Sequence, residues 1–121
     1  MAIPTKNKYG ARKLTAPDGQ KFDSVKEYHR WGCLRLLERA GKITDLKRQV
    51  KYVLIPAQRD ENGKLLEREV SYVADFKYFD NSLGEEVVED VKGYKGGSAY
   101  NIFSIKRKLM LFCHGIVVKE V

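Results

Sequence analysis

The sequence predicts a mixed α/β (α+β) domain with the element order α-β-β-β-α-β and a mixed central sheet flanked by helices. Two segments have apolar residues at helical spacing, and three strand-like segments between them are separated by turn sequences. A short apolar segment follows the second helix, which favours a sheet with helices packed against it. The 121 residues of the chain fit one domain, 1–121, and the chain contains no apolar run that could span a bilayer.

The first helix is expected to follow a basic N-terminal arm. Residues 1–20 contain Pro and Gly at intervals that interrupt any regular pattern, so we expect an arm or a loosely packed loop there. Ser24 and Glu27 have the spacing of a capping box, which places the start of the helix. Apolar residues then recur at helical spacing up to Gly41, a typical helix stop.

Strand-like composition, rich in Val, Tyr and Phe, marks the middle of the chain. The expected strands are residues 49–57, 66–79 and 86–92. The first two are separated by a turn sequence at 60–64 and the last two by one at 80–84.

The second helix is expected over residues 99–113, and residues 116–121 close the fold as a strand. Helical spacing predicts that one apolar stripe of this helix faces the core. The residues of this stripe are Ile102, Ile105, Leu109 and Phe112.

Two acids lie inside the strand-like segments. Asp75 is in the second strand, and Asp90 is in the third, two residues before Lys92. Side chains alternate along a strand, so Asp90 and Lys92 share a face. An acid among apolar strand residues is costly unless a metal or a partner compensates its charge. Two strands joined by a turn would bring Asp75 beside that pair, and such a group could hold a divalent cation and activate water for phosphodiester hydrolysis.

Each of these acids also has a purely structural explanation. Asp75 could lie on a solvent-facing side of its strand and pair with Lys77, and an acid two residues from a lysine is common on exposed strands. Glu27 could simply accept a hydrogen bond from a backbone N–H at the helix start. It could also reach toward a metal from that helix end, and the two roles are compatible.

The charge of the chain indicates an anionic partner. The formal net charge is +7 and the pI is about 9.4, which favours nucleic acid or an anionic surface. Basic residues of the arm, of the Gly-rich loop after residue 92 and of the second helix could contact phosphates, or could simply be solvated. The candidate DNA-binding residues are Lys8, Arg12, Lys13, Lys95, Lys106 and Lys108.

The motifs together resemble a known superfamily. An acid, a hairpin and then an acid-X-Lys sequence, with a glutamate on a preceding helix, is similar to the PD-(D/E)XK restriction-endonuclease-like nucleases. A closer resemblance is to small, mostly phage-encoded proteins of unknown function placed in that superfamily. The segments that carry it are Asn7-Lys8-Tyr9-Gly10, Phe22-Asp23-Ser24 with Glu27, Gly41-Lys42-Ile43, Leu46, Gln49, Val73-Ala74-Asp75-Phe76, Val88-Glu89-Asp90-Val91-Lys92-Gly93 and Ile105-Lys106-Arg107-Lys108-Leu109.

The resemblance implies a role for each matching residue. Asp75 and Asp90 would bind Mg²⁺ (or Mn²⁺), with the Val91 carbonyl as a further ligand. Lys92 would orient or activate the attacking water, and Glu27 would be the helix-borne acid. Two positions depart from the common pattern, since Asp90 stands where many members have Glu, and Ala74 stands where Pro often precedes the first acid.

The expected function is therefore a Mg²⁺-dependent deoxyribonuclease. We expect an endonuclease that cuts branched or junction DNA during phage replication or recombination, in the cytoplasm of a bacterial host. Branched DNA would suit a two-fold symmetric homodimer. The alternative from another class is a non-catalytic DNA-binding protein that uses the same fold, whose binding would depend steeply on salt and would need no metal.

Overall fold

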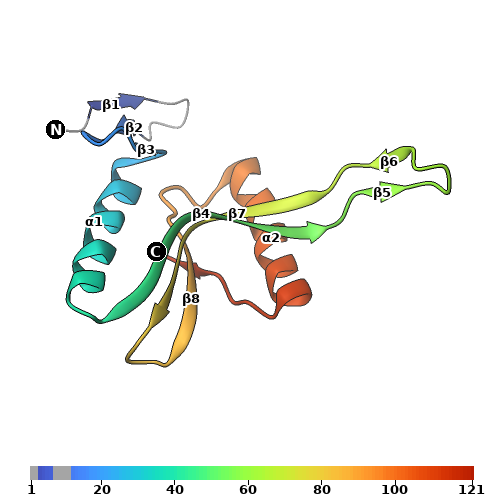
Figure 1. Ribbon diagram of the computed structural model, residues 1–121. Helices are drawn as coiled ribbons and strands as arrows, with labels where there is room; N and C mark the ends of the chain where they lie inside the picture. Colours follow the sequence, from blue (N-terminus) through green and yellow to red (C-terminus); the bar gives the residue numbers. More distant parts are fainter. Residues whose placement is uncertain (1–2, 7–11) are drawn as a thin grey trace. The chain divides into compact units, whose positions relative to one another are not determined.

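The computed structural model describes residues 3–6 and 12–121 (Figure 1). They divide into two compact units, each described here by itself. The first unit comprises the chain up to residue 46 together with 79–85, and the second comprises 47–78 and 86–121. The structure is mixed α+β, with two helices and a mixed four-stranded sheet, as the sequence predicts. No helix in the described part of the chain is long and apolar enough to cross a membrane.

The first unit begins with a small antiparallel sheet. Its strands are β1 (Ile3–Lys6), β2 (Arg12–Thr15) and β3 (Lys21–Phe22), in that order. The prediction of an irregular arm is therefore wrong for these residues. A turn closed by the Ala16 N–H on the Gln20 carbonyl, at 2.8 Å, joins β2 to β3, and the left-handed Gly19 lies within it. Pro and Gly are so closely spaced in this segment that they interrupt the alternating pattern by which short strands are predicted.

Helix α1 (Val25–Arg39) starts at the capping box that the sequence predicts. The Ser24 hydroxyl accepts the Glu27 N–H at 3.0 Å, and the Glu27 carboxylate accepts the Asp23 N–H at 3.1 Å. The helix ends at Arg39 and is capped by Ala40, and Gly41 follows with a φ of 74°, a conformation that glycine adopts without strain. Leu14, Ala16 and Phe22 form a buried cluster of this unit.

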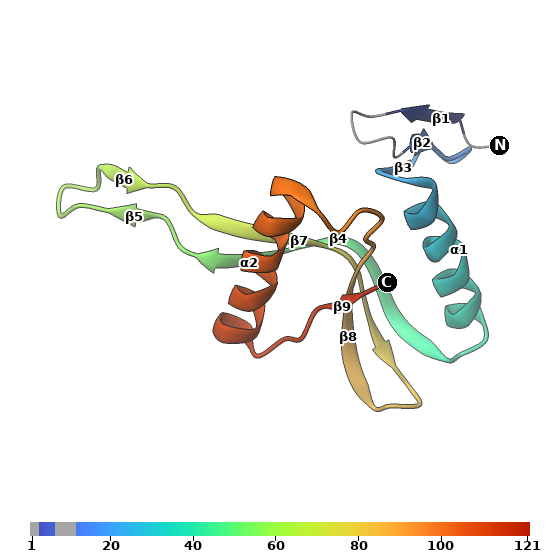
Figure 2. The ribbon, with the colours of Figure 1, turned by 180° about the vertical axis from the view of Figure 1, so that it is seen from behind.

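The main sheet has the strand order β4-β7-β8-β9. Its strands are β4 (Ile43–Ile55), β7 (Val70–Asp80), β8 (Glu85–Asp90) and β9 (Lys119–Glu120). β8 and β9 run parallel, with Asp90 opposite Glu120, and Figure 2 shows β9 beside β8. β4 begins earlier in the chain than predicted, while β9 is shorter than the predicted closing strand.

A two-stranded ribbon extends from β4 and β7. It consists of β5 (Gln58–Arg59) and β6 (Leu65–Glu67), joined through a turn in which Gly63 has a φ of 83°. The sequence predicted this turn. It predicted one continuous strand over 66–79, however, whereas β6 and β7 are separate strands.

Helix α2 (Gly97–His114) packs on the sheet through a different stripe from the predicted one. Phe103 and Met110 are buried with Tyr72, Ala74 and Val88 of the sheet. The predicted core positions are instead exposed, except Leu109, which is partly buried; the exposed fractions are Ile102 55%, Ile105 59% and Phe112 88%. A step of one residue rotates a helix by about 100°. In the observed orientation of α2, the centroid of the Phe103 ring lies 6.1 Å from that of the Tyr72 ring on the sheet.

Candidate functional site

The hairpin of β7 and β8 brings Asp75 to the segment that contains Asp90 and Lys92. The Asp75 carboxylate, through Oδ2, accepts the backbone N–H of Val91 at 2.8 Å. Val91 is the residue between Asp90 and Lys92, so the first acid contacts the middle of the acid-X-Lys sequence. The structure thus places together the three residues that the sequence singles out in this unit.

Asp90 is a buried acid with two side-chain partners. Only 5% of the residue is exposed. Its Oδ2 accepts the Tyr72 hydroxyl at 2.5 Å, and its Oδ1 lies 2.7 Å from Nζ of Lys92. The ion pair shows that Asp90 and Lys92 lie on the same side of the strand, as side-chain alternation predicts. These partners compensate the cost of burying a carboxylate.

Lys92 is held between a charge and an aromatic ring. Its ammonium lies 3.8 Å from the centroid of the Phe103 ring, and its side chain is 21% exposed. Its backbone is fixed as well, because the Lys92 N–H donates to the Val121 carbonyl at 2.9 Å and the Val121 N–H donates to the Asp90 carbonyl at 2.9 Å. A lysine fixed at both ends presents its ammonium in a defined position.

Tyr72 is a site residue that the sequence analysis did not identify. Burial raises the pKa of its hydroxyl above the ordinary value, and the charge of Asp90 and their hydrogen bond raise it further. The hydroxyl therefore stays protonated and donates to Asp90. Its position in the strand-like run carried no separate signal, since a tyrosine in a buried strand is ordinary.

Gln49 is the second such residue. It lies in β4 with a φ of 52°, a left-handed conformation that is unusual for a residue other than glycine. Its side-chain amide, through Nε2, lies 3.4 Å from Oδ1 of Asp75. Gln49 belongs to the segments that carry the resemblance, but no pattern in the sequence indicated its backbone conformation or its partner.

Glu27 belongs to the first unit, where it closes the start of α1. The residue is 3% exposed, its carboxylate accepts the Asp23 N–H, and its own N–H donates to the Ser24 hydroxyl. The structural explanation is therefore sufficient for its burial. Its predicted role as a helix-borne acid near the metal stays a prediction.

Glu89 precedes Asp90 and is fully buried. Its carboxylate accepts the hydroxyl of Tyr78, whereas the Asp90 carboxylate accepts that of Tyr72. The two adjacent acids therefore use different tyrosines of β7, and the pair with Lys92 belongs to Asp90.

The candidate DNA-contacting residues are scattered over both units. Lys13 is exposed on β2, where Arg12 also lies, and Lys8 falls outside the described residues. Lys108 is exposed on α2 and Lys106 is half-buried. Lys95 lies 3.9 Å from Glu120, which also accepts from Tyr100 and Arg107 and has a lowered pKa because of those hydrogen bonds.

The donor atoms around Asp75 fit a hard divalent cation in chemical type. Mg²⁺ prefers oxygen ligands, is held by one or two carboxylates and keeps several waters. Within residues 3–6 and 12–121, no group of three or more His, Cys, Asp or Glu lies together as a ready metal cluster. Asp75 and Asp90, two of the predicted metal-binding acids, lie at the same hairpin, where Asp75 contacts the peptide that follows Asp90.

The fold and site define a mixed α+β protein with two acids and a lysine gathered at one hairpin. The chain belongs to a family described as protein of unknown function (DUF1064), and the model of that family matches residues 6–114. No curated protein and no solved structure matches the chain.

Proposed function

We propose that this protein is a metal-dependent endonuclease that hydrolyses phosphodiester bonds in DNA, with Asp75, Asp90 and Lys92 as its centre. The hydrogen bond from the Val91 N–H to the Asp75 carboxylate supports this most directly. It joins the first acid to the peptide between the second acid and the lysine. The proposal includes the PD-(D/E)XK type of fold and its α-β-β-β-α-β core order.

The backbone around Val91 supports a third oxygen ligand. The Asp90 carbonyl and the Lys92 N–H both bond to Val121, so they point toward the β9 edge. In an extended chain, the backbone groups of successive residues alternate between the two edges. The Val91 N–H accordingly points the other way, to Asp75, and its carbonyl shares that direction. The carboxylates of Asp75 and Asp90 and the Val91 carbonyl oxygen are the groups that would hold Mg²⁺ or Mn²⁺.

Each residue of the centre has a distinct task. A bound divalent cation would polarise the scissile phosphate and lower the pKa of a bound water. Lys92, fixed by Asp90 and by the ring of Phe103, positions the attacking water or stabilises the charge that develops on the phosphate. Tyr72 holds the Asp90 carboxylate in place by donating to it.

A buried ion pair that only stabilises the fold would explain Asp90 and Lys92, but it would not explain Asp75. The carboxylate of the half-buried Asp75 is held at the peptide between the two residues of that pair. Gln49, in its left-handed conformation, provides a second contact to the same carboxylate. Unusual backbone conformations of this kind gather at functional sites.

The net charge of +7 supports DNA as the substrate, and so does the exposure of Lys13 and Lys108. The proposed substrate is branched or junction DNA. A homodimer would suit the two-fold symmetry of branched DNA. A role in phage replication or recombination rests on the resemblance, and both are parts of the proposal.

The test is a cleavage assay with four-way junction, flap, single-stranded and duplex DNA, each with Mg²⁺, Mn²⁺ or EDTA. We expect Asp75→Asn and Lys92→Ala to lose cleavage by orders of magnitude while DNA binding is largely kept. Glu69→Gln is the matched control, because it removes a carboxylate charge from the same unit at an exposed pair with Lys51, 3.1 Å apart.

Normal metal-dependent cleavage by Asp75→Asn would refute the proposed centre. Tight, salt-sensitive binding without cleavage in any metal would favour the non-catalytic DNA-binding protein instead.

A further inference from the structure

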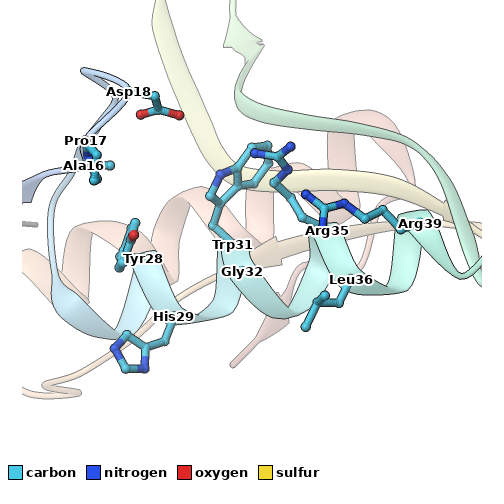
Figure 3. A pocket seen from close by; sticks show the side chains of 10 residues that line it. All are labelled: Ala16, Pro17, Asp18, Tyr28, His29, Trp31, Gly32, Arg35, Leu36 and Arg39. Carbon is cyan, nitrogen blue, oxygen red and sulfur yellow. The ribbon is translucent and has the colours of Figure 1, made fainter. Parts of the chain in front are cut away.

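The first unit contains a pocket of about 460 Å³ between α1 and the turn that follows β2. Figure 3 shows Tyr28, Trp31, Arg35 and Arg39 on the helix side, with Asp18 on the turn side. Residues three or four positions apart on a helix are neighbours on one face, so these four side chains form a continuous row. None of them belongs to the proposed nuclease centre.

The row combines an aromatic plane with two guanidinium groups. Trp31 packs against the buried cluster of Leu14, Ala16 and Phe22, which fixes its ring, and it also lines the pocket. The Arg35 guanidinium lies 5.7 Å from the centroid of the Trp31 ring. Arg39 follows one helical turn later. An aromatic plane next to arginines is the combination that binds a base and its phosphate.

Gly32 keeps this pocket open. Glycine in the middle of a helix costs about 1 kcal/mol relative to alanine. A Cβ added at Gly32 would meet no atom within 4 Å, so packing does not require a glycine at this position. Gly32 also lines the pocket. A larger residue there would favour the helix and occupy the space, which makes the pocket itself the feature that the glycine preserves.

The charges of the lining favour a nucleotide over a simple anion. Two arginines face one acid, Asp18, whose carboxylate accepts both the backbone N–H and the side-chain amide of Gln20, at 3.0 and 2.8 Å. These bonds lower the pKa of Asp18, the backbone one most, so the acid stays ionised. An ionised carboxylate repels a lone phosphate but accepts from the amino group or ring N–H of a base.

We propose that this pocket binds one nucleotide of an unpaired strand, with its base stacked on Trp31 and its phosphate held by Arg35 and Arg39. The inference builds on the proposed function, because such a strand would belong to the branched DNA that is cut. It adds the substrate feature that is recognised: an unpaired base rather than the duplex alone.

The chain has one tryptophan, so intrinsic fluorescence reports on Trp31 directly. The protein is titrated in EDTA, where metal-dependent cleavage cannot occur, with a single-stranded oligonucleotide, a duplex of equal length and free dAMP. We expect the single strand to quench the fluorescence most strongly and to bind most tightly. Quenching by dAMP as strong as by the oligonucleotide would overturn the proposal of strand binding and indicate a site for a mononucleotide.

Two variants test the pocket itself. Gly32→Leu fills it at a position where a side chain meets no obstacle, and Trp31→Phe shrinks the stacking surface. Because Trp31→Phe removes the one tryptophan, binding by both variants is measured by the anisotropy of a dye-labelled single strand. We expect each to weaken single-strand binding at least about fivefold, with circular dichroism and thermal unfolding of Gly32→Leu retained. Lys26→Ala, which removes one positive charge from α1 outside the pocket lining, is the control for charge alone.

The outcomes separate this inference from the proposed nuclease. If Gly32→Leu binds single strands as tightly as the unchanged protein, the pocket is not the binding site, while metal-dependent cleavage would still stand. If Gly32→Leu loses binding and the unchanged protein never cleaves, the pocket stands and the nuclease fails.

Discussion

Glu27 and Asp90 are both buried carboxylates, one in each compact unit, and the cost of burying each is compensated in a different way. Glu27 accepts a backbone N–H only four residues away, at the start of its own helix. Asp90 accepts from a tyrosine on a neighbouring strand and pairs with a lysine beside Asp75. Burial of an acid therefore does not by itself identify a reactive site. The nature of its partners is more informative: Asp90 accepts a tyrosine hydroxyl and pairs with a lysine next to the peptide that Asp75 contacts.

The largest effect is expected from Asp90→Ala. It leaves the Lys92 ammonium in a largely buried position without its counter-charge, so the free energy of unfolding should fall by about 3–5 kcal/mol. Urea denaturation measures the change. The double variant Asp90→Ala, Lys92→Met should recover part of the loss. A loss under about 1 kcal/mol for Asp90→Ala would mean that Lys92 readily finds another environment.

Glu27→Ala is expected to cost about 1–2 kcal/mol of stability, because it removes an acceptor from the helix cap. Ser24→Ala, which removes the other half of the capping box, should cost about 1 kcal/mol. Both are measured by thermal or urea unfolding. Glu27→Gln separates the capping role of Glu27 from a metal-side role, since it keeps an oxygen acceptor and removes the charge. If Glu27→Gln is stable but does not cleave DNA, Glu27 has the metal-side role that the resemblance implies.

Tyr72→Phe should lower stability by about 1 kcal/mol, because Asp90 loses a hydrogen-bond donor. The variant should also respond less to alkaline pH. The folded-state pKa of Tyr72 is raised, so its contribution is complete below the unfolded pKa near 10 and is lost as pH rises through the folded value. Stability measured from pH 8 to 11 should therefore fall less steeply for Tyr72→Phe than for the unchanged protein. Parallel pH profiles would contradict this assignment.

The smallest effect is expected from Gln49→Gly. A left-handed residue other than glycine costs about 1–2 kcal/mol, and glycine adds about 0.5–1 kcal/mol of backbone entropy cost, so stability should rise by about 0.5 kcal/mol. Cleavage should fall if the contact of Gln49 with Asp75 matters to the centre. Increased stability with unchanged cleavage would remove Gln49 from the site.

The sequence predicted those parts of the molecule that depend on local patterns. The capping box at Ser24 and Glu27, the turn at Gly63 and the common face of Asp90 and Lys92 all follow from spacings of a few residues. The hairpin linking β7 and β8 was also visible as a turn between two strand-like runs, and it made the approach of Asp75 predictable.

Features that depend on tertiary packing were not predictable in the same way. The buried stripe of α2 contains Phe103, whose ring contacts that of Tyr72 on the sheet, and an apolar helix offers more than one such stripe. The contact of Tyr72 with Asp90 joins two strands at a register that the sequence does not specify. The left-handed conformation of Gln49 could not be predicted from the residue type, since glutamine rarely adopts that conformation.

The bonds of Val121 to Asp90 and Lys92 bear on the order in which the molecule is assembled during translation. Synthesis proceeds from the amino terminus, so the hairpin that contains Asp75 and Asp90 leaves the ribosome well before Val121 does. Until then, the outer edge of β8 lacks its β9 partner, and the backbone on either side of Val91 is not anchored. The nascent chain can thus complete its first helix and its hairpin before the backbone that carries Asp90 and Lys92 is fixed by Val121.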